Sequence, residues 1–172
     1  MASGAALDLG GYSLANTLTL SGTGISSGGA LTNSTSTAAT LSGAITLGAD
    51  TVIKGNAGDL TFSGAINGAY GLTVSTTNKS ITQSGVVGAT AAPTAVTFSA
   101  GTGNVTLGAA LTAQGPVSIT GGTLTLNSSI TSNATSGSGI ALNGRNIQQA
   151  AGTTVSTQGA DIAYSVTQAA FT

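Results

Sequence analysis

Residues 58–88, GDLTFSGAINGAYGLTVSTTNKSITQSGVVG, decide the fold of this chain. They contain three triplets with a threonine at the centre: Leu60-Thr61-Phe62, Leu72-Thr73-Val74 and Ile81-Thr82-Gln83. Successive side chains of an extended strand point to opposite faces, so each triplet places its outer residues on one face and its threonine on the other. The glycine, asparagine and serine residues between the triplets favour turns. The stretch therefore predicts three short strands joined by tight corners.

The triplet pattern recurs along most of the chain. Clear copies are Leu18-Thr19-Leu20, Ile45-Thr46-Leu47, Val96-Thr97-Phe98, Val105-Thr106-Leu107, Val117-Ser118-Ile119 and Leu124-Thr125-Leu126, and weaker ones are Ile140-Ala141-Leu142 and Ile162-Ala163-Tyr164. Equivalent positions are spaced regularly, since Leu60 to Ile81 is 21 residues and Ile81 to Val105 is 24. A period of about 22 residues with three short strands in each is typical of a chain that closes one coil per repeat.

These observations predict an all-β fold, a parallel β-helix (β-solenoid) with about 22 residues per coil and seven to eight coils in 172 residues. Residues 1–16 are expected to form an irregular N-terminal coil or cap, and residues 17–172 a single β-solenoid repeat domain. The alternative is a β-sandwich, for which Asn67-Gly68 and Asn143-Gly144 offer turn signals. A sandwich, however, needs longer strands and a larger aromatic core than three Phe and three Tyr provide.

Charge is scarce in this chain. There are three basic and four acidic residues, no histidine and no cysteine, and the net charge is −1. Three scattered basic residues cannot form the cluster that binds nucleic acid, and no apolar run is long enough to cross a membrane. Low charge also suits strands stacked in register, because like charges on neighbouring coils repel. We therefore expect no nucleic-acid partner, no membrane insertion, no disulfide and no Cys-ligated metal.

The sequence offers little for catalysis. Without histidine, a His-based triad, a His-ligated zinc site and imidazole acid–base chemistry are excluded. Asp50 and Asp59 are the only acidic pair within one expected coil. Two carboxylates can hydrolyse glycosides, but no aromatic sugar platform accompanies these two, so solvated turn aspartates are the favoured interpretation. We predict no enzyme activity and assign no catalytic, cofactor-binding or metal-binding residue.

Three weaker sequence patterns can each be interpreted as structural or as functional. Residues 55–59, GNAGD, are similar to half of a calcium-binding nonapeptide, but the motif has no tandem copy and is expected to be a tight turn. Thr17-Leu18-Thr19 and Thr123-Leu124-Thr125 fit an ice-binding ladder locally, although most coils show one central threonine only. Glycosylation sequons, frequent by chance in such a composition, occur at Asn33, Asn78, Asn104, Asn127 and Asn133.

Residues 58–88, followed by AVTFSAGTGNVTLGAALTAQGPVSITGGTLTLNSSI at 95–130, resemble the repeat regions of large bacterial surface proteins. The resemblance is to the filamentous haemagglutinin-like and autotransporter-associated β-strand-repeat type, and it covers roughly residues 17–166. The motifs that match are the LTL and VTF strands, the SGAI turns and the GAYGLTV segment, which connects a turn to the following strand. The resemblance implies a right-handed coil, export to the bacterial surface or medium, and a stalk or fibre role in adhesion or biofilm.

The main expectation is thus a structural repeat segment of a secreted bacterial adhesin or extracellular fibre. The alternative is a self-assembling filament subunit that stacks end to end, because an uncapped solenoid end presents unpaired strand edges. An ice-binding surface and a carbohydrate-active enzyme are minor alternatives. Expected partners are further copies or neighbouring repeats at the solenoid ends. A host or cell-surface ligand has no recognisable binding motif in the sequence.

Overall fold

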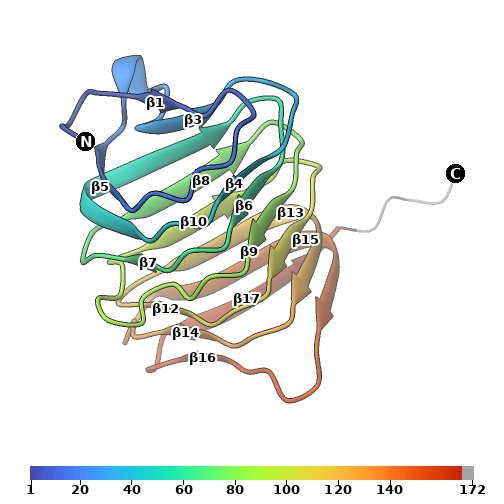
Figure 1. Cartoon of the computed structure of the whole chain (residues 1–172). Coiled ribbons are helices and arrows are strands. Elements are labelled where there is room, and N and C mark those ends of the chain that lie inside the picture. The colour runs from blue at the N-terminus through green and yellow to red at the C-terminus, as the bar shows by residue number, and fades with distance from the viewer. Residues whose placement is uncertain (168–172) are drawn as a thin grey trace, which may run out of the picture.

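A computed structural model describes residues 1–167, which form short strands and no α-helix (Figure 1). The strands are β1 (Leu7–Asp8), β2 (Leu18–Gly22), β3 (Leu31–Asn33), β4 (Ala39–Leu41), β5 (Ile45–Gly55), β6 (Leu60–Phe62), β7 (Ile66–Asn67), β8 (Leu72–Thr76), β9 (Ile81–Gln83), β10 (Val96–Ser99), β11 (Val105–Leu107), β12 (Leu111–Ala113), β13 (Val117–Leu126), β14 (Ile130–Ser132), β15 (Ser138–Gln149), β16 (Val155–Thr157) and β17 (Asp161–Val166). A single 3-10 turn, η1 (Ile25–Ser27), stands between β2 and β3.

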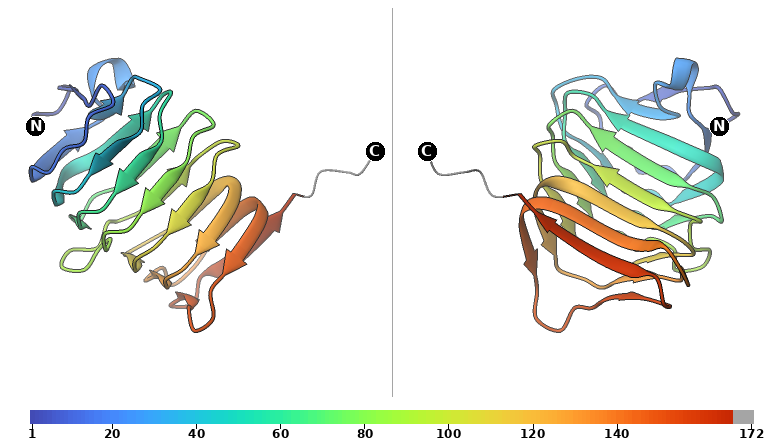
Figure 2. Two further views of the ribbon diagram at one scale, coloured as in Figure 1. Left: turned by 45° about the vertical axis from the view of Figure 1, so that its right-hand side comes forward. Right: turned by 180° about the vertical axis from the view of Figure 1, so that it is seen from behind.

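The strands form three parallel ladders, which we name faces A, B and C. Face A contains β1, β3, the second half of β5, β8, β10, the first halves of β13 and β15, and β17. Face B contains β4, β6, β9, β11 and the second halves of β13 and β15. Face C contains β2, the first half of β5, β7, the bridging residue Val87, β12, β14 and β16. Figure 2 shows the resulting coils stacked from the N-terminal to the C-terminal end.

Register between coils is kept along most of each face, with shifts only between Leu20 and Gly22 and between Ser138 and Ile140 among the described strands. On face A one column of paired residues runs through every coil: Leu7, Leu31, Ile53, Val74, Phe98, Ile119, Leu142 and Tyr164. Its seven steps average about 22 residues, so the solenoid has about seven turns. At a strand spacing of about 4.8 Å, the stack is about 34 Å long.

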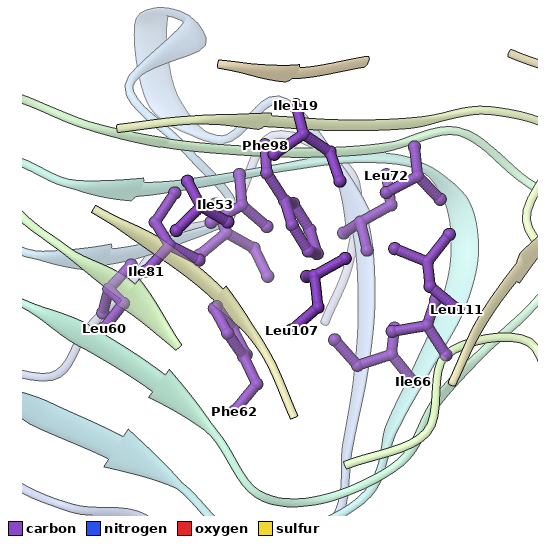
Figure 3. Packing of buried hydrophobic residues seen from close by; sticks show 14 of the residues in the cluster. Ile53, Leu60, Phe62, Ile66, Leu72, Ile81, Phe98, Leu107, Leu111 and Ile119 are labelled. Atoms are coloured by element: carbon purple, nitrogen blue, oxygen red, sulfur yellow. The ribbon is translucent and has the colours of Figure 1, made fainter. Parts of the chain in front are cut away.

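The core fills the interior between the three faces. Figure 3 shows side chains of all three faces pointing toward one another, among them Ile53 and Phe98 from face A, Phe62 and Leu107 from face B, and Leu111 from face C. These five side chains have no exposed surface. Burying such a side chain contributes about 1.5–3 kcal/mol, which cannot offset the ordering of a lone coil. Coils therefore gain stability only by stacking.

The predicted fold class is confirmed: the described chain is all-β, parallel and coiled with a period of about 22 residues. All three triplets in residues 58–88 are strands, with their threonines outward and partly exposed. The triplets that predict strands do not include β12, β14 or β16 on face C. Their second inward positions hold Ala113, Ser132 and Thr157, which are too small or too polar to mark a buried strand.

Candidate functional site

Asp50 and Asp59 lie at different corners of the coil. Asp50 precedes the face A half of β5, and Asp59 follows it after a three-residue corner, so the five strand residues 51–55 alone span about 16 Å between them at about 3.3 Å per residue. Asp50 Oδ1 accepts the Gly71 backbone N–H at 2.7 Å, and Asp59 Oδ1 accepts that of Ser80 at 2.8 Å. Each carboxylate thus connects its corner to the next coil, and the fold does not bring the two together.

The same connection is made by asparagine in other coils. Asn67 Oδ1 accepts the Thr90 N–H at 2.9 Å, and Asn104 Oδ1 accepts the Thr123 N–H at 3.0 Å. A further bond of this kind runs from the Thr102 N–H to Asn78 Oδ1 at 3.0 Å. Corner backbone N–H groups have no strand partner of their own, so a side-chain oxygen from the preceding coil satisfies them. The polar corner residues therefore hold successive coils together.

Residues 55–59 form a packed corner, as expected of a tight turn. A Cβ on Gly58 would stand 2.3 Å from the Thr37 carbonyl oxygen and 2.6 Å from Asn33 Nδ2, so the preceding coil presses directly on this backbone. Asn33 Nδ2 itself donates to the Thr37 carbonyl at 2.8 Å. In the described part of the chain, no three His, Cys, Asp or Glu side chains gather as metal ligands would.

The sequon asparagines differ in accessibility. Asn33 is completely buried, and its Oδ1 accepts the Gly11 N–H at 2.9 Å, so an enzyme could not reach it in the folded chain. Asn78 and Asn104 use their side-chain oxygens within corners. Asn127 is exposed, and Asn133 exchanges amide hydrogen bonds with glutamines of the neighbouring coils.

The outward threonines of face B form a single file. Thr40, Thr61, Thr82, Thr106 and Thr125 are paired from one coil to the next. The file continues into Gln148, and the flanking outward positions change from serine at Ser63 to glycine at Gly108. The surface is thus regular along the solenoid axis, at about 4.8 Å per step, but not across it. Each of these face B strands thus carries one central threonine, and in the described chain no second file of threonines runs beside it.

Charged side chains are few and lie at exposed positions, except for the half-buried Lys54. The Ser34 hydroxyl, donating to Asp8 Oδ2 at 2.5 Å, and the backbone N–H groups of Gly10 and Ser34 lower the pKa of Asp8 below 3.8. Arg145 stands at the opposite end, at the corner between faces A and B. It borders a shallow, open depression whose other lining residues are Thr120, Gly121, Asn143, Gly144 and Thr167.

The two ends of the solenoid differ. At the N-terminal end the Met1 amino group donates to the Thr19 carbonyl of β2, and Met1 packs on the core. Ser3 lies against Gly22, since a Cβ there would be 2.7 Å from Ser3 Oγ. Residues 1–6 thus cover part of this end. At the C-terminal end β17 pairs only with β15 among the described residues, and its side chains are all exposed.

One buried polar group, the side chain of Gln83, was not among the predicted site residues. Gln83 has no exposed surface and occupies an inward column of face B between Phe62 and Leu107. Its Nε2 donates to the Gly85 carbonyl, whereas its Oε1 is buried without a hydrogen-bond partner among the described residues. The signal was present in the sequence, because this triplet alone of the first three ends in a polar side chain.

The geometry thus gives a rod of stacked coils whose corners are joined by polar side chains, with one partly covered end and one open end. No helix of the described residues has the length and apolar character that crossing a membrane requires. No protein-family model matches the sequence, and neither the curated proteins nor the solved structures include a match.

Proposed function

We propose that this chain is a structural repeat segment of a secreted bacterial surface adhesin or extracellular fibre, where it serves as part of a stalk. The observation that carries the proposal is the unbroken face A column from Leu7 to Tyr164, which runs through every coil of the described chain. A solenoid of this kind grows by one strand spacing per repeat without changing its cross-section. It therefore suits a role in which length and stiffness are the functional quantities.

The use of polar residues supports the same role. The corner side chains that catalysis or metal binding would need free, Asp50 and Asp59, each accept a backbone N–H of the next coil. Their oxygens stabilise coil stacking at two different corners. We accordingly propose that the protein is not an enzyme, and that the hydrogen bonds of its corner side chains stabilise the stacking of coils.

Two measurements test the stalk proposal. Antibodies raised against the purified chain should label intact cells of the source organism; labelling that appears only after permeabilisation would contradict a surface location. In single-molecule stretching between the two termini, a stacked rod should lengthen in steps of one coil, about 70 Å each for 22 residues at 3.3–3.6 Å less one strand spacing. Release of the whole chain in one step would argue against independent coil-sized units.

A second candidate is a filament subunit, favoured by the unpaired outer edge of β17 within the described residues. End-to-end stacking would continue the parallel ladders from one chain to the next. Negative-stain electron microscopy across a dilution series separates the two candidates. Isolated rods about 34 Å long support the stalk segment. Filaments of constant width would instead support the assembling subunit.

A further inference from the structure

We propose that one edge of the rod, where face C turns into face A, is a binding site for neutral polysaccharide chains. Figure 1 shows this edge at the bend of β5, between its face C half and its face A half. A stalk can be stiff without binding a ligand, so this site goes beyond the stalk role and does not depend on it. We name it the C–A edge, and it consists of residues 23–30, 48–50, 68–71, 88–95, 114–116, 133–137 and 158–160.

The C–A edge carries the longest connections between strands. Residues 23–30 and 88–95 are connections of eight residues each. At the other two corners, no connection in the described chain is longer than five residues. Insertions in solenoid proteins gather on one face, which is often the face that binds a ligand. The uneven connections therefore indicate that this edge, rather than either of the others, is the functional one.

Tyr70 is the only aromatic residue of the C–A edge, and its side chain is 43% exposed. Its backbone is fixed on both sides. The Tyr70 N–H donates to the Gly68 carbonyl at 2.9 Å, and the Tyr70 carbonyl accepts the Thr94 N–H at 3.2 Å. An aromatic ring presented from a fixed corner can stack on the apolar C–H face of a sugar ring at little conformational cost.

The fold places a carboxylate beside this ring. Asp50 lies at the same edge one coil earlier, and its Oδ1 accepts the N–H of Gly71, the residue after Tyr70, at 2.7 Å. That bond fixes the carboxylate, and among the described residues none donates a hydrogen bond to Oδ2. A carboxylate oxygen is a strong acceptor for a hydroxyl group. Tyr70 and Asp50 together offer a sugar unit both stacking and hydrogen bonding.

Side-chain amides continue the C–A edge along the later coils. Asn133 Nδ2 donates to Gln114 Oε1 at 3.3 Å, and Gln158 Nε2 donates to Asn133 Oδ1 at 3.2 Å. An amide has two N–H donors and two acceptor lone pairs, so each of these side chains retains groups that can bind hydroxyls. From Asp50 to Gln158 the edge crosses five coil spacings, about 24 Å. This length suits an extended chain of several sugar units.

The charges of the C–A edge favour a neutral ligand. The edge contains no lysine or arginine. Lys54 lies on face A, and Lys79 and Arg145 lie at the corner between faces A and B. An acidic polysaccharide would therefore meet the Asp50 carboxylate without a compensating cation. A neutral chain of hydroxyl groups needs no such cation.

Defined hexasaccharides test the proposal on the full chain. Isothermal titration calorimetry with cellohexaose, mannohexaose and chitohexaose should give a dissociation constant of about 1 mM or tighter for at least one of the three. Hexagalacturonic acid, an acidic counterpart, should bind more weakly. Tyrosine fluorescence gives a second readout, because the chain has three tyrosines and no tryptophan. No binding of any neutral hexasaccharide, or tighter binding of the acidic one, would overturn the proposal and leave the stalk role untouched.

Tyrosine variants locate the site. Tyr70→Ala should weaken binding of the hexasaccharide at least about tenfold, whereas Tyr70→Phe, which keeps the ring, should stay within about threefold of the parent. The control Tyr12→Ala removes a side chain that is 79% exposed but lies outside the C–A edge, so it should leave the affinity unchanged. Equal losses of affinity in Tyr70→Ala and Tyr12→Ala would contradict a site at this edge.

Asp50→Asn and Asp59→Asn form a second matched pair. Each carboxylate accepts a backbone N–H of the next coil, at 2.7 Å and 2.8 Å, and asparagine keeps that acceptor, so both variants should melt near the parent. Only Asp50 lies beside Tyr70. Asp50→Asn should lower the affinity for the neutral hexasaccharide about threefold or more, because an amide oxygen is a weaker acceptor than a carboxylate. Asp59→Asn should leave it unchanged, and an equal effect of both variants would overturn the proposal.

Discussion

Asp59 and Ser80 are adjacent across two coils: Asp59 Oδ1 accepts the Ser80 backbone N–H at 2.8 Å. The two residues are 21 positions apart in the chain, nearly one period of the solenoid. Asp50 makes the equivalent bond to Gly71 over the same separation. The two carboxylates that the sequence offered as a catalytic pair therefore serve as links between coils, each at its own corner.

Replacing Asp59 tests that role. Asp59→Asn keeps an oxygen for the Ser80 N–H, so the free energy of unfolding should change by less than about 0.5 kcal/mol. Asp59→Ala removes the acceptor and should cost about 1 kcal/mol, a modest loss because the site is exposed. Urea unfolding followed by circular dichroism measures both. Polysaccharide hydrolysis by the parent chain that Asp59→Asn abolishes would contradict the non-catalytic assignment.

Gln83 gives the opposite prediction, a substitution that stabilises. Its buried Oε1 has no partner in the described chain, and its neighbours in the column are Phe62 and Leu107. Gln83→Leu removes the unsatisfied oxygen, and with it the Nε2 bond to the Gly85 carbonyl, but it keeps most of the volume and buries an apolar side chain, so the free energy of unfolding should rise by about 1 kcal/mol. The control Gln83→Ala, which leaves a cavity, should lower it by about 2 kcal/mol. A destabilised Gln83→Leu would show that the oxygen is satisfied in solution.

The periodic part of the fold could be predicted from the sequence, because apolar alternation and the 22-residue spacing act locally and repeat. What could not be predicted depends on neighbouring coils. Whether Asp59 is a free carboxylate or a link is decided by where Ser80 lies in the next coil. Likewise, the alternation of Ile81-Thr82-Gln83 places Gln83 on the inward face, but Phe62 and Leu107 in the neighbouring coils leave its Oε1 without a partner in the described chain, and no local pattern shows this.

The inward columns carry the stability of the stack. Val105 has no exposed surface and Leu72 has 1%. Leu72→Asp or Val105→Asp would bury an unpaired charge and should lower the free energy of unfolding by more than about 4 kcal/mol, enough to unfold the neighbouring coils. The matched control is Thr106→Asp, one residue along the same strand but outward, which should cost less than about 1 kcal/mol. Unchanged thermal melting of both core variants would mean that these side chains do not face a core.

Stability should depend on pH through Asp8. Its pKa is lowered in the folded chain, chiefly by the Ser34 hydroxyl, so the ionised form favours folding. The contribution is complete above the ordinary pKa of 3.8 and disappears as the pH falls through the lowered value. The difference in melting temperature between the parent and Asp8→Ala should therefore be constant from pH 7 to about pH 4 and shrink below it. It should be small, because Asp8 is exposed. Ser34→Ala should weaken the pH dependence, and a difference that grows toward low pH would reverse the assignment.

The SGAI motif, at residues 42–45 and 63–66, forms the corners between faces B and C, where its glycine meets the backbone of the preceding coil. A Cβ on Gly64 would stand 2.0 Å from the Gly43 carbonyl oxygen, and one on Gly85 would stand 2.1 Å from that of Gly64. These glycines are required by close approach of successive coils, since neither has a positive φ. Gly64→Ala must push two backbones apart and should cost about 3 kcal/mol or more.

The control for this corner is Gly71→Ala. The nearest atom to a Cβ there is Asp50 Oδ1 at 3.3 Å, the end of a side chain that can move, so the loss should stay below about 1 kcal/mol. Thermal and urea unfolding of the two variants compare a corner closed by backbone with one closed by a side chain. If Gly64→Ala and Gly71→Ala are equally stable, the coils at the Gly64 corner are farther apart than described. The SGAI motif would then reflect the turn preference of glycine alone. A large fall in the free energy of unfolding for Gly64→Ala alone would show that Gly64 is required for the close approach of successive coils.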